Sequence, residues 1–414
     1  MEQAILVYLD ITGDPVKIGQ CWWHYRNTRE SMSFEYDRAW LHHPLRFSLD
    51  PALHLAAGSF HASPDKPLFG AIDDSAPDRW GRLLMRRSER KRAEVEKRSV
   101  RTLKEIDFLL LVDDAARIGA LRFKKEESGP FLTTYNAHHV PPLITVGLLL
   151  TAANHILQES ETEEDIRLLL APGSSLGGAR PKASVKDKDG HLAIAKFPCK
   201  DDDRDMIAWE AVALTLAAKA GITVPEWRLE PVGRKRVLVS RRFDRKDHTR
   251  IPFLSAMSAL EAKDNEMHSY LEIADAIRRM SASPQEDLEE LWRRIVFTVL
   301  ISNVDDHLRN HAFLYHGERG WRLSPAYDLN PTPLDIKPRI LSTAIDLTDP
   351  TASVDIALHV AQYFDLTHAR AQEILTEVST ATAKWRQEAV KLKIKKTEID
   401  RMEHSFSNNN FLTR

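Results

Sequence analysis

The chain has 414 residues, of which 43% are hydrophobic and 29% charged, and its formal net charge is −2. These values are typical of a globular protein of two or three domains, and they exclude a general electrostatic attraction to nucleic acid or to an anionic membrane. No stretch approaches the roughly 18 uninterrupted apolar residues of a membrane span, so we expect no membrane partner. Cys21 and Cys199 are too far apart in the sequence to suggest a metal site. We therefore expect free thiols and a cytoplasmic protein.

The first 125 residues predict a small α+β domain. Apolar alternation indicates strands at 4–10, 16–23 and 32–41, and a helix follows near 74–98. Residues 105–123 then predict a short helix and a strand. Within 79–101, ten lysines and arginines stand against three acids. A solvated helix face explains this excess, and a docking surface for nucleic acid or an acidic partner is the alternative.

A polar segment with glycine and prolines, 124–142, marks the first domain boundary. The second region, 143–248, begins with two predicted helices. A strand pair turning at Asp189–Gly190 follows, and then a helix that ends near Gly221 and one more strand. The third region, 249–414, is predicted to be helical apart from two polar segments.

The segment "APGSSLGGARPKASV", residues 171–185, holds three glycines and two serines before a strand. Glycines allow backbone N–H groups to approach a phosphate closely. A flexible loop has the same composition, and the P-loop ending GK[ST] is absent. The segment alone therefore leaves a phosphate site and an ordinary loop both open.

Lys196 lies between apolar neighbours in the strand "HLAIAKFP". A lysine at an inward strand position requires a carboxylate or a phosphate partner, and the next helix offers Glu210. A glycine loop, a strand lysine and a helix glutamate in this order match the nucleotide site of protein kinases, although an exposed strand lysine remains the simpler alternative.

The polar cluster "ISNVDDHLRNHAFL" follows an apolar helix, and a solvated loop would explain it. However, Asp305 and Asn310 reproduce the D-x-x-x-x-N spacing of kinase catalytic loops, in which the aspartate accepts the proton of the attacking hydroxyl and the asparagine binds Mg²⁺. Asp328, in "LSPAYDLNP", is placed as a second metal ligand. His307 occupies the position where many kinases carry a lysine, and Asp306 is interpreted as a structural residue that caps the loop.

Together, "SSLGGARPKA", "RRFDR", "NVDDHLRNHAFL" and "LSPAYDLNP" resemble the HipA family, the serine/threonine kinase toxins of bacterial type II toxin–antitoxin modules. The amino-terminal "VKIGQCWW" and "SMSFEYDRAWL" resemble the small domain that precedes the kinase in that family, whereas 60–125 matches only loosely. The resemblance implies an α+β fold, with an N-terminal domain at 1–125, a mixed α/β kinase N-lobe at 143–248 and an all-helical C-lobe at 249–414.

The resemblance also implies the roles of individual residues. Asp305 is the catalytic base with His307 beside it, Asn310 and Asp328 bind Mg²⁺, and Ser175 or the adjacent Ser174 is autophosphorylated. The hinge beside adenine falls at Arg241–Phe243, although family members often have glutamate at the position of Arg241. The residues implied to contact ATP are Gly177, Gly178, Ala179, Arg180, Lys182, Lys196, Glu210, Arg241, Phe243, His307 and Asn310.

The sequence thus predicts an ATP- and Mg²⁺-dependent protein serine/threonine kinase that acts as a toxin. Its implied partners are a helix-turn-helix antitoxin, operator DNA through that antitoxin, and a substrate protein from a class that includes the aminoacyl-tRNA synthetases. Two alternatives remain: a kinase-fold scaffold that binds the antitoxin on DNA, and a small-molecule kinase, since D-x-x-x-x-N also occurs in antibiotic phosphotransferases.

Overall fold

The structure is a computed structural model that describes residues 2–27, 29–63, 65–132, 145–170, 178–247, 249–317 and 320–406. The chain divides into two compact units: unit 1 comprises Met1–Lys200 and Glu230–Leu254, and unit 2 comprises Asp201–Leu229 and Ser255–Arg414. The chain therefore passes between the units three times. The predicted N-terminal domain and much of the predicted N-lobe share unit 1, and the domain boundaries inferred from sequence stay predictions.

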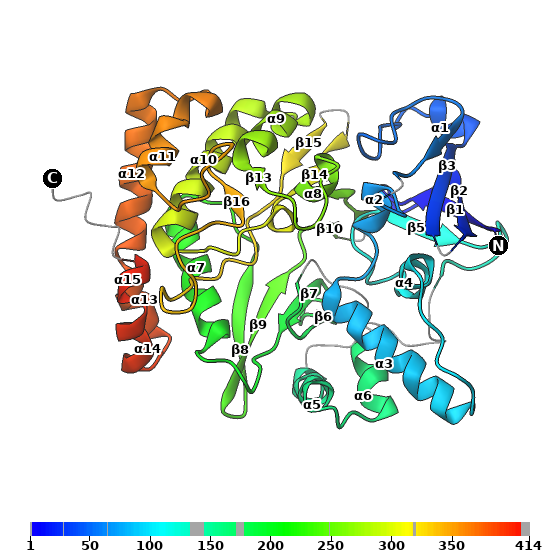
Figure 1. Ribbon diagram of the computed structural model, residues 1–414, viewed down its shortest axis with the longest axis horizontal. Helices are drawn as coiled ribbons and strands as arrows, with labels where there is room; N and C mark the ends of the chain where they lie inside the picture. Colours follow the sequence, from blue (N-terminus) through cyan, green and yellow to red (C-terminus); the bar gives the residue numbers. More distant parts are fainter. Residues whose placement is uncertain are drawn as a thin grey trace. The chain divides into compact units, whose positions relative to one another are not determined.

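Unit 1 contains a five-stranded antiparallel sheet in the order β4-β3-β2-β1-β5 (Figure 1). Its elements are β1 (Glu2–Leu9), β2 (Val16–Arg26), β3 (Arg29–Tyr36), α1 (Arg38–Leu41), β4 (Ser59–His61), α2 (Gly70–Asp73), α3 (Arg79–Val95), α4 (Glu105–Leu111) and β5 (Leu121–Lys124). The three predicted strands are confirmed, but the third ends earlier than expected. The carboxylate of Asp37 accepts a hydrogen bond from the backbone N–H of Ala39, which caps α1 where the sequence predicted more strand.

The rest of unit 1 is built around a second antiparallel arrangement, in which β7 pairs with β6 on one side and β9 on the other. Its elements are α5 (Val146–Leu157), α6 (Glu163–Leu170), β6 (Lys182–Lys186), β7 (Leu192–Lys196), β9 (Lys235–Arg241), β10 (Arg245–Lys246) and β11 (Thr249–Arg250), whereas β8 (Trp227–Val232) and β12 (Phe253–Ser255) span the boundary between the units. Helices α3, α5 and α6 lie side by side (Figure 1) and contribute to one apolar core with β6, β7 and β9. This core explains why the predicted helices and hairpin form where the sequence placed them.

The basic residues of α3 are largely neutralised within unit 1. Arg82 forms an ion pair with Glu105, and Arg87 with the buried Glu161. Arg98, which follows the helix, pairs with the buried Glu89. These contacts favour the interpretation of the basic segment as a solvated, internally paired surface over a docking surface.

Unit 2 is mainly helical, and α10 packs against α9 and α12 within it. Its elements are α7 (Met206–Lys219), α8 (Ala256–Ala259), β13 (His268–Ser269), α9 (Tyr270–Met280), α10 (Pro284–Ile301), η2 (Leu308–Asn310), β14 (Ala312–Tyr315), β15 (Trp321–Leu323), β16 (Thr343–Ala344), α11 (Val354–His359), η4 (Ala361–Phe364), α12 (His368–Thr382), α13 (Trp385–Lys391), α14 (Lys396–Arg401) and α15 (Glu403–Phe406). The prediction of an all-helical lobe is therefore wrong: β14 pairs with β15 and β13 with β16. β14 begins in the first of the two polar segments and β15 lies in the second, so only the β13–β16 pairing falls where the sequence predicted helix alone.

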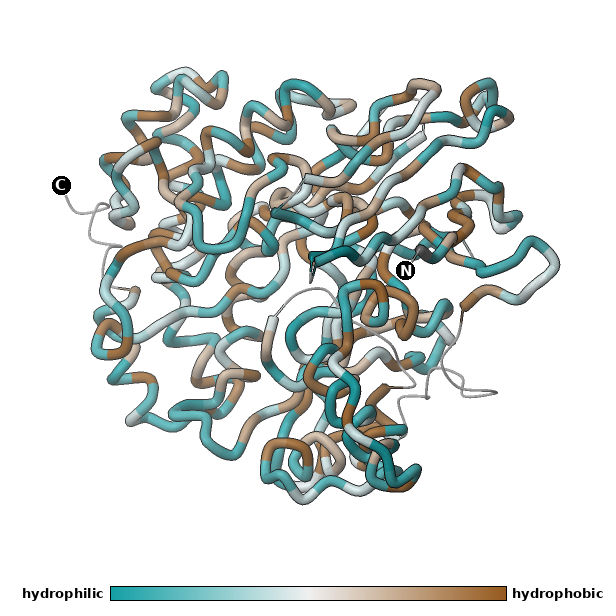
Figure 2. Tube along the Cα trace, turned by 45° about the vertical axis from the view of Figure 1, so that its right-hand side comes forward, coloured by the Kyte–Doolittle hydropathy of each residue, from teal (hydrophilic) through white to brown (hydrophobic). Residues whose placement is uncertain are grey.

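Hydrophobic and hydrophilic residues alternate along many of the helices, as Figure 2 shows. This pattern is typical of helices with one buried face. Among the residues that the structure describes, none of the helices combines the length and the apolar character that a membrane crossing requires.

Candidate active site

The segment that follows α10 is held in place at its first residue. Ser302 ends the helix in the left-handed region with φ 54°. Its hydroxyl donates to the backbone carbonyl of Ser405 and accepts from the guanidinium of Arg339. The tight bend ends the helix and redirects the chain, after which Asn303 and Val304 stay buried and Asp305 is exposed.

Asp306 anchors the middle of this segment from inside unit 2. Its buried carboxylate accepts hydrogen bonds from the Tyr270 hydroxyl at 2.6 Å and from His311 Nε2 at 3.1 Å, while its backbone carbonyl accepts one from Thr343 Oγ1. Burial alone would raise the pKa of Asp306, but the interaction with His311 and the hydrogen bonds from His311 and Tyr270 lower it below its ordinary value. The structural interpretation of Asp306 is supported, although the residue holds the segment against the core rather than capping a turn.

This anchor leads to a stability prediction. Tyr270→Phe removes a buried donor to Asp306, so we expect the free energy of unfolding to fall by about 1–3 kcal/mol, measured by urea denaturation. The matched control is Tyr363→Phe, because the Tyr363 hydroxyl donates to Asp275 at the exposed surface. Equal effects of the two substitutions would contradict an anchoring role for Asp306.

Asp305 and Asn310 lie on the same short segment but in different environments. The Asp305 side chain is 63% exposed, and the Asn310 residue only 5%. Asn310 Nδ2 donates to the backbone carbonyl of Asp305 at 3.2 Å, whereas Asn310 Oδ1 is buried without a hydrogen-bond partner. An exposed carboxylate is accessible to a substrate hydroxyl, and a buried amide oxygen without a partner fits the oxygen ligand that Mg²⁺ requires.

The segment that carries Asp328 is fastened to the catalytic segment. Tyr327 Oη donates to the backbone carbonyl of Arg309, and the backbone N–H of Asn330 donates to Asn303 Oδ1. Asp328 itself has a left-handed φ of 59° and accepts from Asn330 Nδ2 at 3.0 Å. The structure thus joins the segments that hold Asp305, Asn310 and Asp328, and the metal-binding role of Asp328 stays a prediction.

A cavity behind the catalytic segment is too small to receive a nucleotide. It is lined by Ile222, Arg294, Phe297, Thr298, Asp306, Asn310, His311, Ala326, Tyr327 and Leu329, and its volume of about 10 Å³ accommodates about one water molecule. His307 Nδ1 is also buried and without a hydrogen-bond partner.

Asp305 has an ion-pair partner that the sequence did not indicate. Lys337 Nζ lies 3.2 Å from Asp305 Oδ1, and both side chains are more than half exposed. The two residues are 32 positions apart, and no motif surrounds Lys337, so sequence reasoning had no signal for the pair.

The predicted nucleotide-binding residues of unit 1 are only partly described. Ser174, Ser175 and Gly177 lie outside the described residues, whereas Gly178 has φ +96°, a conformation that favours glycine. Lys196 ends β7, with Lys182 opposite it on β6 and Leu238 opposite it on β9. The contacts of Gly178, Ala179, Arg180 and Lys196 with ATP stay predictions.

Lys182 has a structural contact that the sequence did not predict. Its buried ammonium group lies 3.0 Å from the buried Asp78 carboxylate, which also accepts from the N–H of Gly81 and so caps α3. In addition, Trp80 Nε1 donates to the Lys182 carbonyl. Lys182 thus ties β6 to α3, and its contact with ATP stays a prediction. Glu210 lies on α7 and is 5% exposed, and its pairing with Lys196 also stays a prediction.

The "RRFDR" segment, assigned to the adenine hinge by resemblance, contains a buried charge cluster. Arg242 donates to the backbone carbonyls of Ala116 and Arg117 and to the Asp244 carboxylate, which also accepts the N–H of Gly119. Arg242 and Asp244 are 2% and 0% exposed. This cluster fastens the end of β9 to the loop before β5. Arg241 and Phe243, which flank Arg242, are partly exposed, and their place at the hinge stays a prediction.

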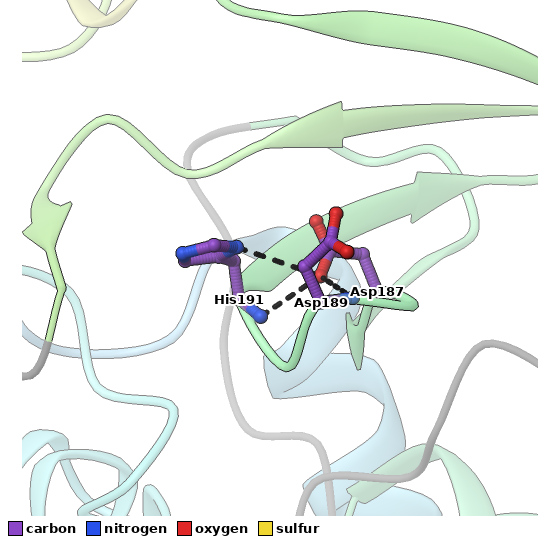
Figure 3. Close-up of side chains that lie close together, drawn as sticks. All are labelled: Asp187, Asp189 and His191. Carbon is purple, nitrogen blue, oxygen red and sulfur yellow. Dashed lines mark hydrogen bonds and ion pairs between the residues drawn. The ribbon is translucent and has the colours of Figure 1, made fainter.

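Asp187, Asp189 and His191 come together at the turn between β6 and β7 (Figure 3). The Asp187 carboxylate accepts hydrogen bonds from the backbone N–H groups of Asp189 and His191, and Gly190 has φ +82°. These are the contacts of a side chain that stabilises a hairpin turn. The predicted turn at Asp189–Gly190 is confirmed, and the cluster serves the turn.

Comparisons with known proteins give a family match, two related sequences and a similar solved structure. The HipA-like C-terminal domain family matches residues 174–385. A putative kinase of Sinorhizobium fredii, Y4mE, is 24% identical over 355 residues, which are 76% of this chain and 77% of that protein. A putative kinase of Haemophilus influenzae is 29% identical over 179 residues, or 38% and 52% of the two chains. A chain in the Shewanella oneidensis MR-1 toxin–antitoxin complex of HipA, HipB and operator DNA superposes with a TM-score of 0.66 at 16% identity, covering 98% of this chain and 95% of that one.

Proposed function

Because the chain belongs to the family of proteins with a HipA-like C-terminal domain, we propose that it is a protein serine/threonine kinase that uses ATP and Mg²⁺. The observation that carries the proposal is the pairing of an exposed carboxylate, Asp305, with a buried amide oxygen of Asn310 that lacks a protein partner. Two relatives named putative kinases support the same reaction class.

In the proposed mechanism, Asp305 orients the acceptor hydroxyl and takes its proton as the phosphoryl group is transferred. The anchored Asp306 keeps Asp305 on the exposed side of the segment, so that little rearrangement is needed. Asn310 and Asp328 would hold Mg²⁺, which neutralises charge on the ATP phosphates. Lys196 and the backbone N–H groups of the glycine loop would bind those phosphates.

We also propose that the kinase is a toxin that phosphorylates itself on Ser175 or Ser174. A phosphate on the loop that binds ATP would repel the nucleotide and switch the enzyme off. The proposed partner is a helix-turn-helix antitoxin, supported by a structural neighbour that is a complex of HipA, HipB and operator DNA. The proposed substrate is a protein, with aminoacyl-tRNA synthetases as the first class to test.

The test is mass spectrometry of the intact, phosphatase-treated protein before and after incubation with MgATP. We expect one added phosphate, located by peptide analysis on Ser174 or Ser175. Binding of ATP without any gain in mass would favour a small-molecule kinase or a kinase of other proteins only. Absence of ATP binding would contradict the proposal and favour the antitoxin-binding scaffold.

The metal role of Asn310 can be tested without measuring catalysis. Asn310→Ala should weaken Mn²⁺ binding by at least about 10-fold. Substituting a residue that only hydrogen-bonds to a metal ligand already lowers metal affinity by about 10-fold or more, and removing the ligand itself should lower it at least as much. Electron paramagnetic resonance of free Mn²⁺, in the presence of a non-hydrolysable ATP analogue, measures this affinity. Asn154→Ala, on α5 of unit 1, is the control and should leave it unchanged. Unaltered Mn²⁺ affinity in Asn310→Ala would remove Asn310 from the metal site.

A further inference from the structure

Among the described residues, Asp305 forms an ion pair with Lys337, whose Nζ lies 3.2 Å from Asp305 Oδ1. Its position is fixed by the chain on both sides. Before it, the backbone N–H of Thr332 donates to the carbonyl of Ser302. After it, Arg339 donates to the Val299 carbonyl and to Ser302 Oγ. Both anchors lie at the end of α10, so the short stretch that carries Lys337 is held over the start of the catalytic segment.

The place of Lys337 follows from the geometry of the proposed reaction, on which this inference rests. A base must lie about 3 Å from the acceptor oxygen, and that oxygen lies roughly 3–3.5 Å from the phosphorus that it attacks. The reacting oxygen of Asp305 is therefore within roughly 6–6.5 Å of that phosphorus. The Lys337 ammonium group, 3.2 Å from Asp305, is within roughly 9–10 Å of it before any movement. The Lys337 side chain is 52% exposed and has four rotatable bonds, so it can close this distance without disturbing the backbone.

We propose that Lys337 is a further catalytic residue, which contacts the oxygens of the transferred phosphoryl group while Asp305 receives the proton. Negative charge spreads over these oxygens in the transition state, and a positioned cation stabilises it. His307 is nearer in sequence, but its Nδ1 is buried within the protein. The ion pair with Asp305 places the ammonium group near the site before the substrate arrives.

The test compares Lys337→Met and Lys337→Arg by single-turnover autophosphorylation of phosphatase-treated protein, followed by mass spectrometry. Lys337→Met should lower the rate constant at saturating ATP by about 10²-fold, and the half-saturating ATP concentration should stay within about twofold. Lys337→Arg retains the charge and should recover most of the rate. A merely structural residue would not produce this separation of rate from affinity, nor its recovery by arginine.

The matched control is Lys391→Met, because Lys391 is also an exposed lysine of unit 2, 2.9 Å from Glu388. It should phosphorylate itself at the wild-type rate. If Lys337→Met is as fast as the wild type, the inference is wrong and the proposed function stands. If the wild-type protein gains no phosphate although it binds ATP, the assumption of autophosphorylation fails first and this inference falls with it.

Discussion

Asp305→Asn is expected to lower the rate of phosphoryl transfer by about 10²–10⁴-fold, the usual contribution of a general base, and to leave the fold intact. The substitution removes the charge of a side chain that is 63% exposed. The lost ion pair with Lys337 is solvent-exposed, and such pairs stabilise proteins by at most about 1 kcal/mol. Incorporation of labelled phosphate from ATP measures the rate, and circular dichroism and urea denaturation report the fold.

Asp335→Asn provides a matched control for this variant. Asp335 is also an exposed carboxylate, 59% accessible, and it pairs with Arg401 at 2.9 Å. Both substitutions remove one surface charge from unit 2, so only a role in the reaction separates them. Wild-type turnover in Asp305→Asn would remove Asp305 from the mechanism, and equal losses in the two variants would point to a general effect of charge.

Asp244→Ala is expected to destabilise unit 1 by about 3–5 kcal/mol, because it leaves the buried Arg242 without its carboxylate partner. Arg245 loses the same partner, at 2.7 Å. Hydrogen exchange of peptides that cover the loop before β5 measures the change where the cluster binds. Asp14→Ala, which removes an exposed carboxylate of the same unit, should have little effect. Similar losses in both variants would contradict the cluster's role.

The contribution of Asp244 should depend on pH in a defined direction. Burial alone would raise the pKa of Asp244, but Arg242, Arg245 and the N–H of Gly119 lower it below its ordinary value. Because the pKa of Asp244 is lower in the folded state than in the unfolded state, ionised Asp244 stabilises the fold at any pH above the unfolded-state pKa of about 3.9. This stabilisation is lost as the pH falls through the folded-state pKa. The stability difference between wild type and Asp244→Ala should therefore be full near pH 7 and shrink in strong acid.

Short-range patterns allowed much of the candidate site to be predicted from sequence. Asp305 and Asn310 lie on one segment between α10 and β14, so their spacing already limits their geometry. The structural role of Asp306 could also be predicted from the sequence, since an aspartate next to the base has no obvious part in the reaction. What the spacing could not provide is the different burial of Asp305 and Asn310, which depends on packing in unit 2.

Contacts between residues far apart in the chain could not be predicted from the sequence. Asp78 and Lys182 are 104 positions apart, and neither belongs to a pattern that links α3 to β6. The partnership of Lys337 with Asp305 depends on anchors to α10, which no local motif encodes. The early end of β3 has a different cause, because Asp37 can continue a strand or cap a helix, and alternation alone does not decide between them.

The interleaving of the two units has a consequence for synthesis on the ribosome. Unit 1 lacks β9 until the chain has been made through Glu230–Leu254, although its first portion ends at Lys200. At about 5–20 residues per second, residues 201–254 take roughly 3–11 s to appear. During that time the edge of β7 that β9 will cover has no strand to pair with, and the loop before β5 lacks Arg242 and Asp244. Nascent chains of this protein should therefore remain open to chaperones and proteases until Glu230–Leu254 has been synthesised.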